Sequence, residues 1–107
     1  MVSTLPEPVA RLVAAANSGD TQGFLDTFAA DGTVNDRGRV FTGRDGIQKW
    51  SDAEFIGMHV TLDVTAEITT EEYTTFTATV GGEGFTGRSH FSFTVRDDLV
   101  QQMTITA

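Results

Sequence analysis

The hydrophobic and polar positions of the chain change their period near residue 58. Before it, apolar side chains recur every three or four residues in three stretches, which is the spacing of a buried helix face. Prolines and glycines bound these stretches and place the helix ends. We therefore expect helices between Pro8 and Gly19, between Asp20 and Asp31, and from residues 43–46 to about Phe55. Two short extended segments, 33–36 and 39–42, are expected around a turn at 37–38.

Beyond residue 58, apolar and polar residues alternate, which is the pattern of strands with one buried face. From His59 to Thr69 the apolar positions share one face, and they are Val60, Leu62, Val64, Ala66 and Ile68. The alternation continues in a strand around Phe76 and in strands over 85–95 and 99–107. Turns are expected at 71–72, 81–84 and 97–98, so the second half is predicted to be an antiparallel meander of four long strands.

This order of elements predicts an α+β fold, in which a cone-shaped, curved antiparallel sheet is covered by three N-terminal helices. A length of 107 residues suits one domain, and we assign residues 1–107 to it. A bent sheet closed by helices forms a cone with an internal pocket. Binding of a small molecule is therefore the first function to consider.

The composition of the chain excludes several classes of partner and site. Seven Lys and Arg face 15 Asp and Glu, for a net charge of −8, and the basic residues are scattered along the chain, which argues against nucleic acid as a partner. The absence of cysteine excludes a thiol nucleophile and a thiolate metal site. The N-terminus has no basic region followed by a long apolar one, and no apolar run is long enough for a membrane span. We therefore expect a cytoplasmic protein.

Three stretches that precede the meander carry a family resemblance: residues 15–20, 24–34 and 41–50. Together they resemble the nuclear-transport-factor-2-like superfamily, in its bacterial SnoaL-like branch, which includes ketosteroid isomerase, limonene epoxide hydrolase and polyketide cyclases. The resemblance implies a cone-shaped α+β barrel, a homodimer packed through the convex sheet face, and a small-molecule pocket inside the cone. It implies no single activity, because this scaffold hosts enzymes, binding proteins and assembly modules.

Asp36 is the candidate catalytic residue. It follows Val34 by two positions, so both side chains point inward if both lie on one strand. An acid that faces an apolar pocket has its charged form disfavoured, which raises its pKa toward the range of a general base or acid. The resemblance implies the same role, because the matching Val-x-Asp element of ketosteroid isomerase supplies its base. Alternatively, Asp36 is a turn residue that pairs with Arg37 or Arg39.

The resemblance to ketosteroid isomerase does not extend to its oxyanion-stabilising groups. By alignment these fall at Leu12, which donates no hydrogen bond, and at Ser89, which has only a short hydroxyl. An enolate would be poorly stabilised, so steroid isomerisation is not expected. The Asp–Arg–Asp network of the hydrolase branch, with its Tyr and Asn, has no evident counterpart in the sequence either.

Apolar side chains and two polar ones are candidates to contact a substrate. The set consists of Phe24, Phe28, Phe41, Trp50, Ser89, Phe91, Gln101 and Met103. Ser89 and Gln101 are included because they share face parity with Phe91 and Met103. For any one aromatic residue, membership of the plain core is the competing interpretation. His59 and His90 fall on the outer face by the same parity, and with only two histidines no metal site is expected.

Two functions remain open. The first is a SnoaL-like homodimer that holds a small, largely apolar organic molecule, without metal or organic cofactor, and that carries out acid–base chemistry of the isomerase, cyclase, dehydratase or epoxide-hydrolase type if it is an enzyme. The second is a non-catalytic dimeric binding or assembly module, whose core is filled by its own aromatic residues and whose convex sheet face is the interaction surface. We also expect Asp63, Glu67 and Glu72 to lie on or beside the dimer face, so that the dimer weakens at low salt.

Overall fold

The computed structural model describes residues 5–71 and 73–106. Its first half contains α1 (Glu7–Ser18), α2 (Thr21–Asp26), β1 (Phe28–Asp36), β2 (Arg39–Thr42), α3 (Gly43–Glu54) and a single turn of 3-10 helix, η1 (Ile56–Met58). Its second half contains β3 (Thr61–Thr70), β4 (Tyr73–Gly81), β5 (Gly87–Arg96) and β6 (Leu99–Thr106). The expected turn residue Glu72 and the expected strand end Ala107 lie outside the described residues.

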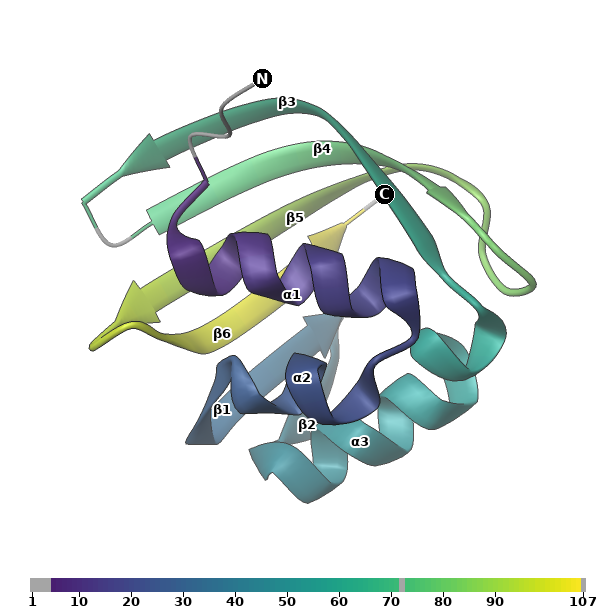
Figure 1. Ribbon diagram of the computed structural model, residues 1–107, viewed down its shortest axis with the longest axis horizontal. Coiled ribbons are helices and arrows are strands. Elements are labelled where there is room, and N and C mark those ends of the chain that lie inside the picture. Colours follow the sequence, from purple (N-terminus) through teal and green to yellow (C-terminus); the bar gives the residue numbers. More distant parts are fainter. Residues whose placement is uncertain (1–4, 72, 107) are drawn as a thin grey trace.

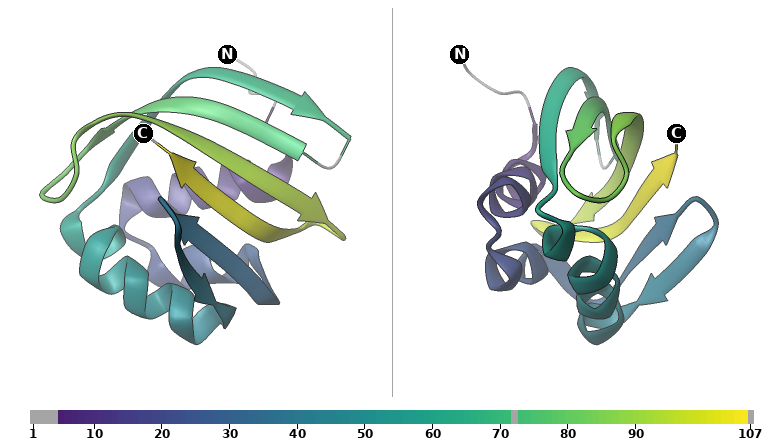
Figure 2. Two further views of the ribbon diagram at one scale, coloured as in Figure 1. Left: turned by 180° about the vertical axis from the view of Figure 1, so that it is seen from behind. Right: turned by 90° about the vertical axis from the view of Figure 1, so that its right-hand side faces the viewer.

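The strands form one curved sheet in the order β2-β1-β6-β5-β4-β3. Figure 1 shows α1 lying across the concave face of the sheet, and α2 and α3 covering the lower part beside β1 and β2. The side view in Figure 2 shows the sheet bending around these helices without closing into a barrel. The α+β class, the curved sheet and the three helices are confirmed, and so is the meander from β3 to β6.

The sheet is antiparallel except at one pairing that the sequence pattern did not specify, because β1 and β6 run parallel. Val34 lies opposite Met103, and Asp36 lies opposite Ile105. β1 and β2 therefore join the meander at β6, with β6 inside the sheet. This pairing aligns the inward residues of β1 with those of β6 and β5, and it places Asp36 in the same row as Phe91.

The second helix is shorter than expected, because it ends at Asp26 and Phe28 already belongs to β1. The Thr27 hydroxyl donates to the Phe24 carbonyl at 2.7 Å and closes the last turn. The Thr27 carbonyl then accepts from the Val100 amide at 2.8 Å, and the Arg44 guanidinium donates to the Phe28 carbonyl at 2.6 Å. Hydrogen bonds to distant segments thus end a helix whose apolar pattern continues.

A β-bulge in β3 changes which side chains face inward. The pairing with β4 skips Thr65, so that Val64 lies opposite Ala78 and Ala66 lies opposite Thr77. Beyond the bulge the alternation is reversed. Ile68, expected on the inner face with Ala66, is 72% exposed on the outer face, whereas Glu67 turns inward and is partly buried. The expectation that Glu67 lies on the outer face is therefore wrong.

The free edge of β3 is held by one side chain from the end of α1. The Asn17 amide donates to the Leu62 carbonyl at 3.0 Å, and its oxygen accepts from the Leu62 amide. Asn17 therefore imitates a neighbouring strand at this position and satisfies both backbone groups of Leu62.

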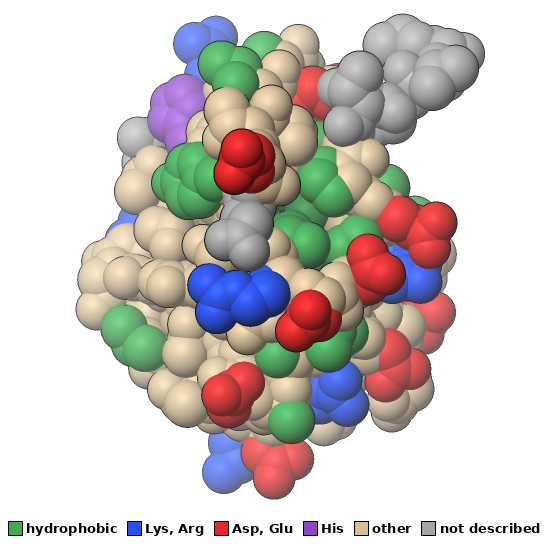
Figure 3. Space-filling model, turned by 90° about the vertical axis from the view of Figure 1, so that its left-hand side faces the viewer, with side chains coloured by type: hydrophobic (Ala, Val, Ile, Leu, Met, Phe, Trp, Pro, Cys, Tyr) green, Lys and Arg blue, Asp and Glu red, His purple; other side chains and the backbone are tan. Residues whose placement is uncertain are grey.

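The charge of the described surface follows the composition. On the face shown in Figure 3 the Lys and Arg side chains stand apart from one another, with Asp and Glu between them. Over the part of the chain that the structure describes, no helix is long and apolar enough to cross a membrane.

Candidate functional site

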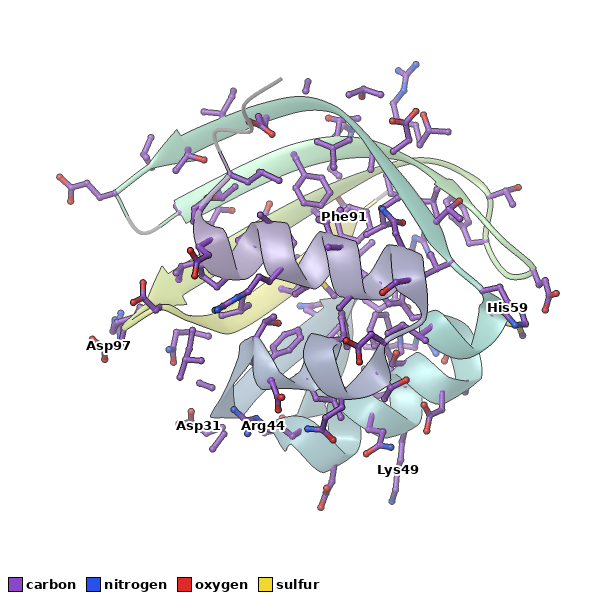
Figure 4. The ribbon with its side chains drawn as sticks, in the orientation of Figure 1. Asp31, Arg44, Lys49, His59, Phe91 and Asp97 are labelled. Carbon is purple, nitrogen blue, oxygen red and sulfur yellow. The ribbon has the colours of Figure 1, made fainter. Side chains whose placement is uncertain are left out.

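A pocket of about 250 Å³ opens between the inner face of the sheet, the C-terminal end of α3 and the loop between β4 and β5. Its aromatic lining consists of Trp50, Phe55, Phe85 and Phe91. Its charged and hydroxyl groups are Asp36, Arg37, Glu54 and Ser89. Figure 4 shows Phe91 on the sheet behind α1, inside the curve of the strands. The pocket is thus mostly apolar, with a few polar groups from different elements, as ligand sites commonly are.

Asp36 lines this pocket at the end of β1, where its side chain is 8% exposed. Its Oδ2 accepts one hydrogen bond from Arg39 Nη2 at 2.7 Å and another from the Trp50 indole at 3.1 Å. Its Oδ1 has a longer contact of 3.6 Å with Arg37 Nη1. The carboxylate thus lines the pocket, as the parity from Val34 predicts, and it is also paired with Arg37 and Arg39.

Arg39 joins two carboxylates. Its guanidinium donates to Glu54 Oε1 at 2.6 Å and to Glu54 Oε2 at 2.8 Å, in addition to its bond to Asp36. The hydrogen bond from Arg39 lowers the pKa of Glu54, and the hydrogen bonds with Glu54 and then with Asp36 raise the pKa of Arg39. The sequence showed no carboxylate–arginine–carboxylate network, but the hairpin and α3 bring these three residues together.

Ser89 has an unusual environment. The residue is 1% exposed. Among the described residues, its Oγ is the one buried side-chain polar atom that has no hydrogen-bond partner. It is located on β5, two positions before Phe91, and lines the same pocket as Asp36. A buried hydroxyl without a partner loses its bonds to water and gains none in return.

Arg37 and Phe85 meet at the mouth of the pocket. Arg37 lies at the tip of the β1–β2 hairpin with φ +54°, in a left-handed conformation that non-glycine residues seldom adopt. Its guanidinium carbon lies 4.3 Å from the centre of the Phe85 ring, a cation–π contact between the hairpin and the β4–β5 loop. Phe85 itself is 46% exposed, so the mouth has an apolar rim.

Of the nine predicted site residues, four line the pocket: Asp36, Trp50, Ser89 and Phe91. Phe24, Phe28 and Met103 are instead fully buried in the core, which corrects their placement. The correction follows from packing, because side chains of the helices and of β1 and β6 fill the narrow end of the cone. Phe41 lies behind Trp50, with ring centres 6.1 Å apart, and also stays outside the lining.

Gln101 is located outside the pocket for a different reason. The pairing of β5 with β6 goes from Val95–Val100 to Thr94–Gln102, so Gln101 is the extra residue of a bulge. Its amide donates to the Arg96 carbonyl at 3.2 Å instead of pointing inward. Parity along a strand fails at such a position, and Gln101 is not among the residues that line this pocket.

Neither histidine lines the pocket. His90 lies on β5 and faces outward, where its Nδ1 is 3.0 Å from the Thr77 hydroxyl. His59 precedes β3, in a left-handed conformation, and its Nδ1 lies 3.0 Å from Glu83 Oε1. Figure 4 shows it at the outer end of the 3-10 turn. Within the described ranges no three His, Asp or Glu side chains are arranged to hold a metal ion.

Sequence reasoning missed Arg37, Glu54, Phe55 and Phe85 as parts of the pocket. The turn composition at Asp36 drew attention to Arg37 as an ion-pair partner only. Phe55 and Glu54 end α3, and nothing in the helical pattern indicates that this end meets the sheet. Phe85 lies in an irregular loop, where alternation gives no direction.

The fold defines a class of protein: a curved, unclosed sheet of six strands covered by three helices. The SnoaL-like domain matches residues 9–103, and the chain belongs to that family. A protein of Sinorhizobium meliloti, provisionally assigned as a polyketide cyclase, is 25% identical to it with a TM-score of 0.87, and the match covers 95% of each chain. No curated protein matches the chain.

Two other solved structures extend the comparison. A protein of Catenulispora acidiphila with a ketosteroid isomerase-like fold, solved in complex with trimethylamine, is 25% identical with a TM-score of 0.83, over 97% of this chain and 87% of the other. A computationally designed 17-OHP binder is 17% identical with a TM-score of 0.83, over 94% of this chain and 88% of the other. The second likeness concerns the fold alone.

Proposed function

We propose that this protein binds a small, largely apolar organic molecule in the pocket between Asp36, Trp50, Ser89 and Phe91. The observation that carries the proposal is the Ser89 hydroxyl, which is buried at the pocket wall without a partner. An unpartnered hydroxyl is costly in the empty protein, and a ligand that bonds to it removes that cost. The aromatic lining supplies the apolar contacts that such a ligand needs.

The volume limits the size of the ligand. An engineered apolar cavity of about 150 Å³ holds one benzene ring, so a pocket of about 250 Å³ fits a body of one or two rings. The apolar rim at Phe85 and Met58 allows part of a longer molecule to project from the mouth. A filled core, as in the competing function, would leave no such volume and would not need a buried carboxylate at its edge.

The test compares two phenylalanine substitutions. Ala53 lines the pocket at its mouth, and Ala14 lies exposed on α1, away from the lining. Native mass spectrometry of the purified protein, and quenching of the fluorescence of Trp50 on addition of 2-decalone, both report binding, because Trp50 is the one tryptophan of the chain. We expect Ala53→Phe to abolish binding and Ala14→Phe to preserve it. Equal binding by the two variants would contradict the proposed pocket.

A second candidate function is acid–base catalysis at Asp36, and the carboxylate–guanidinium–carboxylate arrangement of Asp36, Arg39 and Glu54 favours it. A guanidinium fixed between two acids holds Asp36 in place at the pocket wall and stabilises negative charge there. Isomerase, cyclase, dehydratase and epoxide-hydrolase chemistry all need such a proton-handling group. Replacing Asp36 by Asn would abolish turnover of a substrate found for this pocket while the protein stays folded; unchanged turnover would exclude the role.

A second copy of the chain is the proposed partner, bound through the convex face of the sheet. Because of the bulge in β3, Ile68 is exposed on this face with Tyr73, which is 51% exposed. Around them lies a surface of uncharged Thr and Ser side chains, including Thr75, Thr77 and Ser92. Such a face has few charges to desolvate when it is covered.

A further inference from the structure

The two carboxylate oxygens of Asp36 differ in the number of hydrogen bonds that they accept. Oδ2 already accepts from Arg39 and from Trp50, whereas Oδ1 has only the 3.6 Å contact with Arg37. A carboxylate held by an arginine is ionised and can only accept hydrogen bonds. At the pocket wall Asp36 therefore has acceptor capacity on Oδ1, and a ligand group that meets it must be a donor such as a hydroxyl.

Ser89 provides a second polar point in the same pocket. Its hydroxyl can donate or accept, and among the described residues it is the buried side-chain group that lacks a bond. Asp36 lies opposite Ile105, which lies opposite Phe91, and Ser89 precedes Phe91 by two positions on β5. The two residues are thus two strands apart, about 10 Å, and offset by about 7 Å along the strand. On the inner face Ile105 and Phe91 lie in the same row as Asp36, between Asp36 and the strand that carries Ser89.

The charges around the pocket balance. Asp36 and Glu54 carry two negative charges, and Arg37 and Arg39 carry two positive ones, in contacts of 2.6 to 3.6 Å. A charged ligand would lose its hydration on entering the pocket and would find, among the described residues that line it, no unpaired charge of opposite sign to compensate for this loss. A neutral ligand does not have this desolvation cost and is therefore favoured.

From these three observations we infer that the ligand is a neutral molecule of one or two rings with two separate polar groups: a hydroxyl that donates to Asp36 Oδ1, and a carbonyl or hydroxyl that bonds to Ser89. Hydroxyketones and diols form this class. The inference rests on the proposed binding function, and it adds which chemical groups the pocket selects.

The test uses ligands that share one bicyclic body. The probes are 6-hydroxy-2-decalone, 6-methoxy-2-decalone, 2-decalone and 6-oxodecalin-2-carboxylate, titrated against the full chain by calorimetry and by fluorescence of Trp50. We expect the hydroxyketone to bind about tenfold more tightly than the methoxyketone and 2-decalone, the value of one good hydrogen bond to a charged group. The carboxylate is expected to bind more weakly than all three.

Two variants assign the polar groups to their partners. In Asp36→Asn, Arg39 and Trp50 keep the side-chain oxygen toward themselves, so the amide nitrogen takes the place of Oδ1. The pocket then presents a donor, and the preference for hydroxyl over methoxy should disappear. In Ser89→Ala, the hydroxyketone should lose affinity several-fold, whereas 2-decalol, which has no carbonyl, should lose less. Thermal melting of each variant establishes that it is folded.

The outcomes separate the inference from the function on which it rests. Equal affinity for the four probes in the unsubstituted protein would overturn the inference and leave binding in the pocket intact. A preference that persists in Asp36→Asn would likewise overturn it. If none of the probes binds, and Ala53→Phe and Ala14→Phe are alike in native mass spectrometry, the proposed function fails as well.

Discussion

Ser89 and Ser51 are both fully buried serines, and they should respond in opposite ways to removal of the hydroxyl. Ser51 Oγ accepts from the Ile56 amide at 3.4 Å, whereas Ser89 Oγ has no partner. In the empty protein Ser89→Ala removes an unsatisfied group and should raise the free energy of unfolding by about 1 kcal/mol. Ser51→Ala leaves the Ile56 amide unpaired and should lower it by about 1 kcal/mol. Urea denaturation measures both, and a loss of stability in Ser89→Ala would show that its hydroxyl is bonded.

Arg39 should control the titration of Glu54. In the folded protein the hydrogen bond from Arg39 lowers the pKa of Glu54. The stabilisation from this pair is therefore complete above the unfolded pKa, about 4.3, and disappears as the pH falls through the lower folded pKa. In Arg39→Gln the pKa of Glu54 should return toward its ordinary value. Carboxyl carbon shifts of Glu54, followed by NMR between pH 2 and 7 in the unsubstituted protein and in Arg39→Gln, test this; an identical titration of Glu54 in both would contradict it.

At the scale of elements, one side chain protects the edge of the sheet. Asn17 bonds to both the amide and the carbonyl of Leu62. Asn17→Ala should lower the free energy of unfolding by about 1–3 kcal/mol, because both backbone groups lose their partner in a partly buried position. Amide hydrogen exchange at Leu62 should accelerate in the same variant. Asn17→Asp keeps the acceptor and loses the donor, so the amide of Leu62 should remain protected; equal exchange in both variants would contradict this account.

The strand elements also show how far the sequence could predict the site. Parity from Val34 to Asp36 correctly turned Asp36 toward the interior, because β1 is regular there. The same rule failed at Gln101, where a bulge interrupts β6, and beyond Thr65 in β3. Bulges arise from the fit of neighbouring strands, so a single strand's pattern contains no sign of them. The parallel pairing of β1 with β6 likewise joins segments that are distant in the chain.

At the scale of the whole molecule, salt should govern association. A net charge of −8 per chain becomes −16 in a dimer, and its repulsion is screened by salt. We expect gel filtration at about 0.3 M salt to show more dimer than at about 0.01 M, since the Debye length shortens several-fold. Asp63 stays exposed near the convex face and Glu67 does not, so Asp63→Asn should reduce the salt dependence more than Glu67→Gln.

Association through the convex face has its own control. Ile68→Lys places a charge among the exposed apolar side chains of that face. Val40→Lys is the control, because Val40 is also exposed, at 59%, but lies on β2. The first should shift the dimer to a monomer in sedimentation measurements, and the second should not. If both variants sediment like the unsubstituted chain, the contact lies elsewhere.

The inner position of β6 also affects the kinetics of folding. In the sheet of the described residues, β6 joins β1 and β2 to β5, β4 and β3, so the halves of the sheet meet through contacts between segments that are far apart in sequence. Such contacts slow folding, because the entropy of closing long loops is lost before the contacts form. Asp36 lies on one half of the sheet and Ser89 on the other. A molecule bonded to both would therefore hold the two halves together across β6 for as long as it stays bound. It would prolong the lifetime of the folded state and leave the rate of folding nearly unchanged.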